Sequence, residues 1–336
     1  MDYIMWLVVV IVVLALGFDF INGFHDTANA IATSVSTRAL TPRRAIILAA
    51  VMNLVGALMF TGVAKTVGEK IVNPFKLEVP EQGLTIVIAT LCAAIIWNLI
   101  TWWFGIPSSS SHALIGALAG AGVAALGWGG IDPEGFTSVV KGLILSPFIA
   151  FAIGFVIMFI LKQIFANASP HQLNKAFRGG QVLTAAFQAF SHGTNDAQKA
   201  MGIITLALVA AKVQTDMDIP LWVKIAAALA MALGTSVGGW KIIKTMGTKI
   251  FKIEPINGFS ADLGSASVIL GATLTGLPVS TTHVITSSIL GVGSAKKFSA
   301  VRWGMAGRIV LTWVITIPAV SILAALCYYV LSLFLL

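Results

Sequence analysis

The sequence predicts an all-α polytopic membrane protein built from two related halves. Of its 336 residues, 57% are hydrophobic and only 10% are charged, whereas a soluble domain carries about 25% charged residues. The mean hydropathy is +0.94. Only helices or closed barrels satisfy their backbone hydrogen bonds in lipid. Because the apolar runs of this chain do not alternate with polar residues, we expect helices.

This composition excludes a cytosolic two-domain enzyme, a disordered protein and a nucleic-acid binder. The net charge of +8 is typical of a membrane protein whose inner loops collect Lys and Arg. Cys92 and Cys327 both lie in apolar runs and form neither a disulfide framework nor a metal motif. We therefore expect a lipid bilayer around the chain, no nucleic-acid partner and no cofactor.

Apolar runs mark the expected spans, since a bilayer core needs about 20 residues of helix. The long runs are 4–20, 45–63, 84–104, 142–161, 221–240 and 307–336. The shorter runs, each beside a polar cluster, are 113–127, 182–190, 200–211, 264–275 and 284–293. Irregular backbone at membrane depth survives only inside protein or beside a cavity. The short runs therefore predict broken helices and re-entrant hairpins.

The chain contains a tandem duplication. Residues 22–30 (NGFHDTANA) resemble 192–200 (HGTNDAQKA), and residues 105–112 (GIPSSSSH) resemble 276–283 (GLPVSTTH). Two weaker matches in the same order pair 65–71 with 244–250 and 75–78 with 251–254. We expect one transport domain made of a first repeat (1–161), a cytoplasmic linker (162–181) and a second repeat (182–336).

Loop charges predict that the two halves have opposite topology. In four pairs of equivalent loops, one member is basic and the other is neutral or acidic; for example, 37–44 holds three Arg, whereas 212–224 balances two Lys against two Asp. By the positive-inside rule, both termini then face outside. The same rule places Arg43, Lys175, Lys249 and Lys297 in the cytoplasm and Asp132 and Asp218 outside. Inverted repeats are typical of secondary transporters with a site at the midplane.

Serine and threonine residues follow a proline in both halves, between two apolar runs. A helix start presents unpaired N–H groups and the positive end of a dipole, and Ser and Thr cap it. Such a start with several hydroxyls predicts an anion site; the alternative is that the hydroxyls only cap or bond within their helices. The candidate residues are Ser108, Ser109, Ser110, Ser111, Ser280, Thr281 and Thr282.

The other pair of motifs places Asp26 and Asp196 at membrane depth, where an ionisable group is costly and functional by default. Carboxylate and amide oxygens suit a small hard cation or a proton. The alternative is a structural polar network that joins helices. The neighbouring polar residues are Asn22, His25, Asn29, His192, Asn195, Gln198 and Lys199, and the sequence assigns no role to Asn22, His25, His192 or Gln198. His112 and His283 are as well explained by local packing as by ligation, and their spacing matches no zinc motif.

These four motifs, in this order over essentially the whole chain, resemble the inorganic phosphate transporter (PiT) family. The resemblance implies a cation-coupled phosphate symporter with inverted repeats, hairpins that meet at the midplane and a homodimeric assembly. It also implies that residues 108–111 and 280–282 hold the anion. The co-ion positions that it implies are Asp26, Asn29, Asn195 and Asp196.

Two departures make the chain more similar to the bacterial low-affinity branch, which is associated with protons and metal-phosphate complexes. Sodium-coupled members carry a motif similar to N-D-x-x-N-A in both halves, whereas this chain has His25 and Lys199 in place of one Asn in each motif. An ammonium has no lone pair and cannot ligate sodium. We expect Lys199 to pair with Asp196 or with the anion; the alternative is that it extends to the membrane interface.

The sequence therefore predicts a bacterial inner-membrane symporter that imports inorganic phosphate, alone or as a metal-phosphate complex, by alternating access coupled to H+ or Na+. Asp26, Asp196 and Lys199 are additional candidates for contact with the anion. The alternatives are a sulfate permease of the same family and an anion channel with the Ser/Thr clusters as its filter. An enzyme is not expected, because the two Ser–His neighbours lack a third catalytic group and an assignable oxyanion hole.

Overall fold

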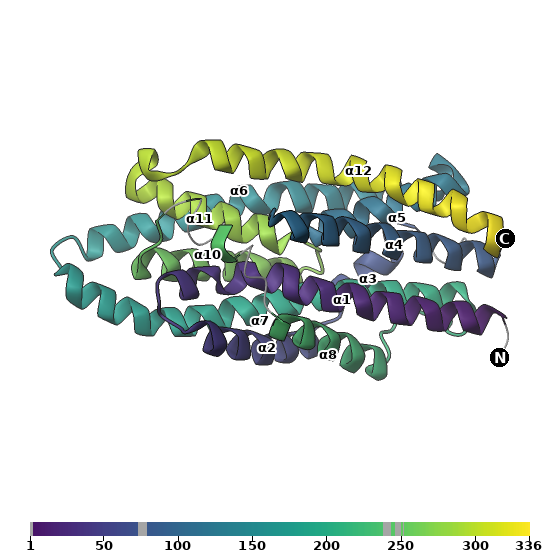
Figure 1. Cartoon of the computed structure of the whole chain (residues 1–336), viewed down its shortest axis with the longest axis horizontal. Coiled ribbons are helices and arrows are strands. Elements are labelled where there is room, and N and C mark those ends of the chain that lie inside the picture. The colour runs from purple at the N-terminus through teal and green to yellow at the C-terminus, as the bar shows by residue number, and fades with distance from the viewer. Residues whose placement is uncertain (1–2, 73–78, 238–242, 246–249, 251) are drawn as a thin grey trace.

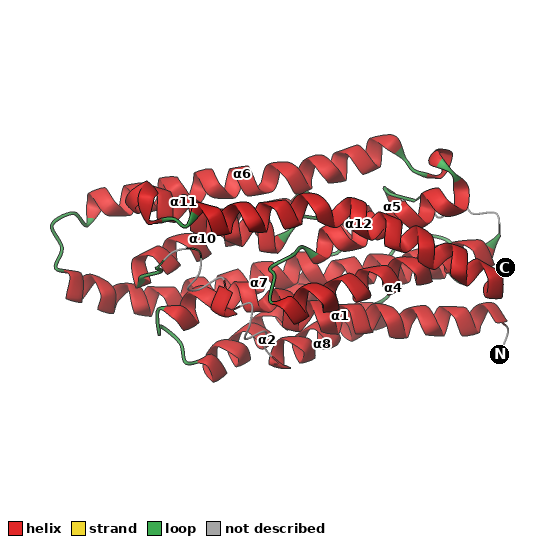
Figure 2. Ribbon diagram, turned by 45° about the horizontal axis from the view of Figure 1, so that its top comes forward, coloured by secondary structure: helices red, strands yellow, loops and turns green. Residues whose placement is uncertain are grey.

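The computed structural model is an elongated bundle of helices (Figure 1). It describes residues 3–72, 79–237, 243–245, 250 and 252–336, and these contain no β-strand (Figure 2). The helices in chain order are α1 (Tyr3–Ser36), α2 (Pro42–Met59), α3 (Gly62–Glu69), α4 (Pro80–Phe104), α5 (Ser110–Leu126), η2 (Trp128–Gly130), α6 (Pro133–Ile164), α7 (Pro170–Ala210), α8 (Leu221–Val237), α10 (Pro255–Leu274), α11 (Thr281–Lys297), η4 (Phe298–Ala300) and α12 (Trp303–Leu335).

Among the described helices, α1, α2, α4, α6 and α12 are long and apolar enough to cross a membrane. Their outward faces expose large apolar side chains, such as Trp103, Phe148 and Leu333. An apolar surface of this extent is typical of contact with lipid. The prediction of an all-α, multi-pass membrane protein is confirmed.

The polar motifs do not interrupt their helices, contrary to the expectation of breaks beside every short apolar run. α1 continues through Asp26 for 34 residues, and α7 continues through Asp196 for 41 residues. The polar side chains of α1 and α7 bond to neighbouring helices. They are therefore satisfied inside the protein while the helical backbone continues without a break. The breaks lie instead at Gly105 and Gly276, whose positive φ angles of 64° and 68° end α4 and α10.

Most of the predicted linker is also helical. α6 ends at Ile164 and α7 begins at Pro170, so that only residues 165–169 lie between them. Ser169 caps α7 by accepting a hydrogen bond from the N–H of Gln172. The polar residues that mark the seam therefore form the first turns of α7, where they are largely exposed.

Equivalent helices of the two halves exchange partners. α1 packs on α8, whereas α7, the equivalent of α1, packs on α2. Glycine allows close backbone approach at both crossings: a Cβ on Gly23 would overlap the carbonyl oxygen of Met231, and one on Gly193 would overlap that of Asn53. In the same way, α5 packs on α12 and α11 packs on α6.

Both termini lie at one end of the bundle, and the α6–α7 connection lies at the other (Figure 1). Tyr3 Oη donates to the carbonyl of Leu335, 3.2 Å away. In the α7–α8 connection, Asp218 accepts a hydrogen bond of 2.6 Å from the Lys65 ammonium on α3. This hydrogen bond holds the pKa of Asp218 below its usual value and raises the pKa of Lys65.

Candidate functional site

The α4–α5 and α10–α11 hairpins meet in the centre of the bundle. Ser111 Oγ donates to the carbonyl of Val279 over 2.8 Å. The imidazole rings of His112 and His283 lie side by side, with 4.3 Å between their centroids. The two Ser/Thr segments that the repeat pairs in sequence are therefore brought together in space.

In each hairpin, the second helix begins with a serine that caps its N-terminus. Ser109 Oγ accepts the N–H of His112 over 3.0 Å, and Ser280 Oγ accepts the N–H of His283 over 3.2 Å. These two serines therefore cap their helices, as the alternative interpretation of the hydroxyls describes. An α-helix leaves the N–H groups of its first residues outside its own hydrogen bonding, so the starts of α5 and α11 direct N–H groups and two positive dipole ends at the contact between the hairpins.

Asp26 joins α1 to both hairpins. Its carboxylate accepts hydrogen bonds from Ser110 Oγ at 2.6 Å and from Thr282 Oγ1 at 3.1 Å. His25 Nδ1 lies 2.7 Å from the same group. One carboxylate therefore contacts a hydroxyl from each half of the chain.

Asp196 occupies the equivalent position on α7 and is part of a buried ion pair. Lys199 Nζ lies 2.6 Å from Oδ1, and Thr281 Oγ1 donates to Oδ2 over 3.1 Å. The Thr281–Asp196 contact repeats the Ser110–Asp26 contact of the first half. Lys199 is 1% exposed, so it pairs with Asp196 as predicted and does not extend to an interface.

Asn22 and His192, which the repeat pairs in sequence, both approach Asp196. Asn22 Nδ2 donates to Oδ2 over 3.4 Å, and His192 Nε2 lies 3.3 Å from the same oxygen. The other ring nitrogen of His192 lies 3.1 Å from Asn53 Oδ1 on α2. These two residues join Asp196 to α1 and α2.

His25 and Asn195 also hold equivalent places, and each positions a hairpin. His25 Nε2 lies 3.2 Å from Thr101 Oγ1, which in turn accepts the Ser108 hydroxyl over 2.8 Å. Asn195 donates to the carbonyl of Leu277 over 3.2 Å and accepts the N–H of Val279 over 3.2 Å. The two residues thus fix the loops that precede α5 and α11.

Gln198 lies away from the hairpins. Its Oε1 accepts the N–H of Ala64 at the start of α3 over 3.0 Å, and its amide donates to the carbonyl of Thr194. Gln198 therefore supports α3. The side chain of Asn29 lies outside the described part of the structure.

The site is closed in this conformation. Residues 108–111 and 280–282, together with Asp26, Asp196 and Lys199, are each at most 1% exposed. In such a low-dielectric environment, hydrogen bonds and ion pairs are strong, and an unpaired charge is costly. An anion that enters must replace the hydroxyl–carboxylate bonds of Ser110, Thr281 and Thr282 with bonds to itself.

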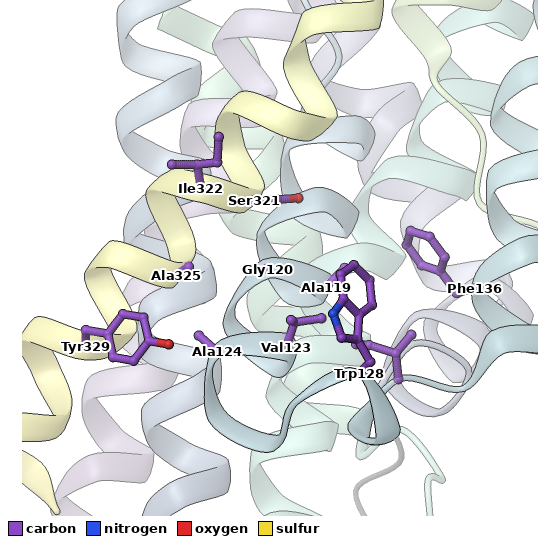
Figure 3. A pocket seen from close by; sticks show the side chains of 11 residues that line it. Ala119, Gly120, Val123, Ala124, Trp128, Phe136, Ser321, Ile322, Ala325 and Tyr329 are labelled. Atoms are coloured by element: carbon purple, nitrogen blue, oxygen red, sulfur yellow. The ribbon is translucent and has the colours of Figure 1, made fainter.

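Two mainly apolar pockets lie near the hairpin helices, and their chemistry differs from that of the contact between the hairpins. One, of about 440 Å³, lies between α5, α6 and α12 and is lined by apolar and aromatic groups such as Trp128, Phe136 and Tyr329 (Figure 3). The other, of about 610 Å³, has His112 and His283 in its wall among mainly apolar residues. The donors that could hold an anion lie between the hairpins and outside these pockets.

Two buried acids are absent from the candidate residues that the sequence predicts. Asp19 lies inside the apolar run 4–20 and is fully buried. Asp262 on α10 is also buried and accepts the Thr33 hydroxyl over 2.7 Å. The rule that selects Asp26, an acid at membrane depth, would have selected Asp19 as well.

Comparison with known proteins matches residues 22–324 to the phosphate transporter family. The chain is 59% identical over 333 residues to a probable low-affinity inorganic phosphate transporter of Bacillus subtilis (strain 168), with 99% of each chain covered. It is 46% identical over 325 residues to a protein of the same description from Rhizobium meliloti (strain 1021), with 96% of each chain covered.

A solved structure described as the sodium-dependent phosphate transporter superposes with a TM-score of 0.86 and 27% identity. The superposition covers 98% of this chain and 100% of that one. The family match spans both Asp motifs and both hairpins, and the two relatives align with this chain over nearly their full length. The chain therefore belongs to the phosphate transporter family, as its resemblance to that family predicted.

Proposed function

We propose that this protein is a bacterial inner-membrane symporter that imports inorganic phosphate by alternating access. The observation that carries the proposal is the convergence of Ser110, Thr281 and Thr282, from two helix N-termini, on two buried aspartates. Hydroxyls, helix N–H groups and the Lys199 ammonium supply the donors that a phosphate anion needs. Asn195, Asp196, Asp26 and Asn29 are the proposed co-ion positions.

Phosphate is favoured over sulfate by the two carboxylates. Asp26 and Asp196 lie among the proposed anion donors and accept hydrogen bonds from three of them. Hydrogen phosphate can donate a hydrogen bond to a carboxylate, whereas sulfate can only accept. Asp26 and Asp196 would therefore repel sulfate and hold hydrogen phosphate. A divalent metal that travels with phosphate as cargo would meet the same carboxylates.

Alternating access between inverted halves is supported by the exchanged packing of the helices. α1 with α8 and α7 with α2 form equivalent pairs around the hairpins, which is the arrangement expected for repeats of opposite topology. The closed site favours a carrier over a channel, because a channel filter needs a continuous aqueous path. The family resemblance supports a homodimer.

Coupling mainly to protons, with at most one sodium ion, is supported by Lys199. Its ammonium lies 2.6 Å from Asp196, at a position where the sodium-coupled motif has a neutral amide. An ammonium supplies one positive charge but no lone pair. The half-site around Asp26 keeps the oxygens needed for one further cation or proton.

The test is uptake of labelled phosphate into proteoliposomes under separately imposed proton and sodium gradients. We expect accumulation with an acid exterior, little change with a sodium gradient, and weak competition by sulfate. Steep, cooperative sodium activation without any response to pH would contradict proton coupling. Flux that runs only down the phosphate gradient would favour the channel.

A further inference from the structure

Asp19 is a buried carboxyl group that has no hydrogen-bond partner among the described residues. It lies on α1 seven residues before Asp26, and residues seven apart on an α-helix share a face. Its side chain is 0% exposed. Within the described part of the chain, neither of its carboxylate oxygens accepts or donates a hydrogen bond.

The two other acids of the site are in a different state. Asp26 is held by Ser110, Thr282 and His25, and Asp196 by Lys199 and Thr281. Such partners allow a carboxylate to remain ionised inside a protein. Asp19 has no equivalent arrangement, so its ionised form is unstable whenever the site is closed.

Two buried amide side chains, Asn22 on α1 and Asn98 on α4, have polar atoms that form no hydrogen bond among the described residues. Asn22 lies one turn from Asp19, and its Oδ1 has no partner among the described residues. The contact between His25 and Thr101 sets the register of α1 against α4. Asn98 lies on α4 one turn before Thr101, and both polar atoms of its side chain are likewise unpartnered in the described structure.

The charges that act on Asp19 come from α7. Asp196 and Lys199 interact with it electrostatically, but the Lys199 charge is already paired with Asp196 over 2.6 Å. Other titratable groups on α1 and on the helices packed against it are Tyr3, His25, Asp26, Arg43, Arg44, Glu81, Cys92, His171, Lys175, Arg178, His192, Lys224, Asp262, His283, Lys296 and Lys297.

We propose that Asp19 carries the proton that is coupled to phosphate transport. The carboxylate binds a proton from the outside, stays neutral while the site is closed around the anion, and releases the proton when water reaches it from the cytoplasm. No bond other than Oδ–H forms or breaks. This inference rests on the proposed symport function.

The experiment compares the wild type with Asp19→Asn in proteoliposomes, by two measurements. The first is accumulation of labelled phosphate driven by an acid exterior. The second is exchange of labelled for unlabelled phosphate at equal pH on both sides, which needs no net proton movement. The matched control is Asp218→Asn, which removes an exposed carboxylate outside the site.

Asp19→Asn is permanently neutral, so we expect it to exchange phosphate like the wild type but to lose accumulation. One coupled proton sustains about a tenfold concentration ratio per unit of pH gradient, and the variant loses that factor. Asp218→Asn keeps both activities. Wild-type accumulation by Asp19→Asn would overturn the inference.

A second variant decides the case in which Asp19→Asn fails to exchange. Asp19→Glu keeps the carboxyl group at a changed depth, so a proton carrier shows accumulation with a shifted pH profile. An unshifted pH profile, or no accumulation, in a folded Asp19→Glu protein would contradict the proposal. Absence of phosphate exchange by the wild type would instead refute the proposed function itself, so the two failures are distinguishable.

Discussion

Lys199 and Asp196 form an ion pair that water does not reach, with Nζ and Oδ1 2.6 Å apart. Taking a single charge out of water is costly, and removal of one partner from a buried pair destabilises a protein by about 3–5 kcal/mol. The pair therefore depends on both members. Variants of Lys199 can therefore separate its contribution to charge balance, which affects stability, from its contribution to phosphate binding, which affects uptake.

Replacement of Lys199 by Asn should lower the thermal stability of the purified protein and reduce phosphate uptake, or make uptake more dependent on sodium. The loss of the ammonium leaves Asp196 as an unpaired buried charge. Thermal unfolding in detergent and uptake in proteoliposomes measure the two effects.

The control is the double variant with Lys199→Asn and Asp196→Asn. It removes both charges, so its stability should recover towards that of the wild type while uptake stays low. A Lys199→Asn protein with unchanged stability and unchanged ion dependence would show that the pair does not contribute to either property.

Ser110 and Thr281 donate equivalent hydrogen bonds to Asp26 and Asp196. A hydrogen bond to a charged group contributes about 1.5–3 kcal/mol, so Ser110→Ala and Thr281→Ala should each weaken phosphate transport by about one to two orders of magnitude. Concentration dependence of uptake measures this. The control is Ser267→Ala on α10, whose exposed hydroxyl bonds to its own helix at Leu263; an equal loss there would contradict a specific role.

At the residue scale, the sequence predicts the site where chemistry repeats. The Asp motif and the hydroxyl cluster each occur once in each half, with matching neighbours. The two copies of each motif therefore support the same interpretation. Asp19 and Asp262 have no acidic counterpart at the equivalent position of the other half, and the repeat offers no signal for them. Thr101, which joins His25 to Ser108, is one of several Thr in an apolar run and becomes informative only through its contacts.

Helix crossings with glycine at the contact are the elements that hold the two halves together. A Cβ on Gly23 would overlap backbone atoms of Met231 and Thr235 on α8, whereas a Cβ on Gly17, one and a half turns earlier on α1, would meet nothing within 4 Å. The two glycines therefore differ in packing while sharing a helix.

Gly23→Ala should lower the unfolding temperature and abolish uptake, because α1 must move away from α8. Gly17→Ala should leave uptake intact and leave stability equal or slightly higher, since Ala favours a helix over Gly by about 1 kcal/mol. Thermal unfolding of the two variants in parallel gives the comparison. Equal behaviour of the two would mean that the close approach at Gly23 is unimportant.

At the element scale, the sequence predicts where the hairpins break more accurately than it predicts how long the helices are. Gly and Pro at 105–107 and 276–278 predict the ends of α4 and α10, because glycine permits the positive φ that the turn requires. The apolar runs do not predict that α7 is one continuous helix, because its polar residues divide the sequence into two shorter apolar runs. Those residues are satisfied by α1, α2 and α11, which are distant in the sequence.

At the scale of the whole molecule, the loop charges of the sequence predict its topology in the membrane, and this can be tested. We expect single cysteines at Asp218 or Asp132 to react with an impermeant thiol reagent added to intact cells, and cysteines at Lys297, Lys175 or Arg43 to react only after permeabilisation. Cys92 and Cys327 are partly buried and should be replaced by Ala in the parent. Outside labelling at position 297 without labelling at 132 would contradict the inverted arrangement. Lys249 lies outside the described residues.

At this scale the sequence also predicts that the halves meet at a shared site, because loop charges indicate opposite orientations. It does not predict which helices exchange partners. That choice depends on where small residues allow backbones to approach, and Gly23, Gly56, Gly193 and Gly234 are four among 32 glycines. Only their contacts distinguish them.

The exchanged packing of α1 on α8 and of α7 on α2 has a consequence for how the chain is made. When the first half has been inserted, α1 presents Asn22 and Asp26 without Asp196 on α7 and Thr282 on α11, which bond to them in the complete chain. Polar and ionisable groups at membrane depth are costly in contact with lipid. Synthesis of the second half therefore completes the polar contacts that α1 makes inside the bundle.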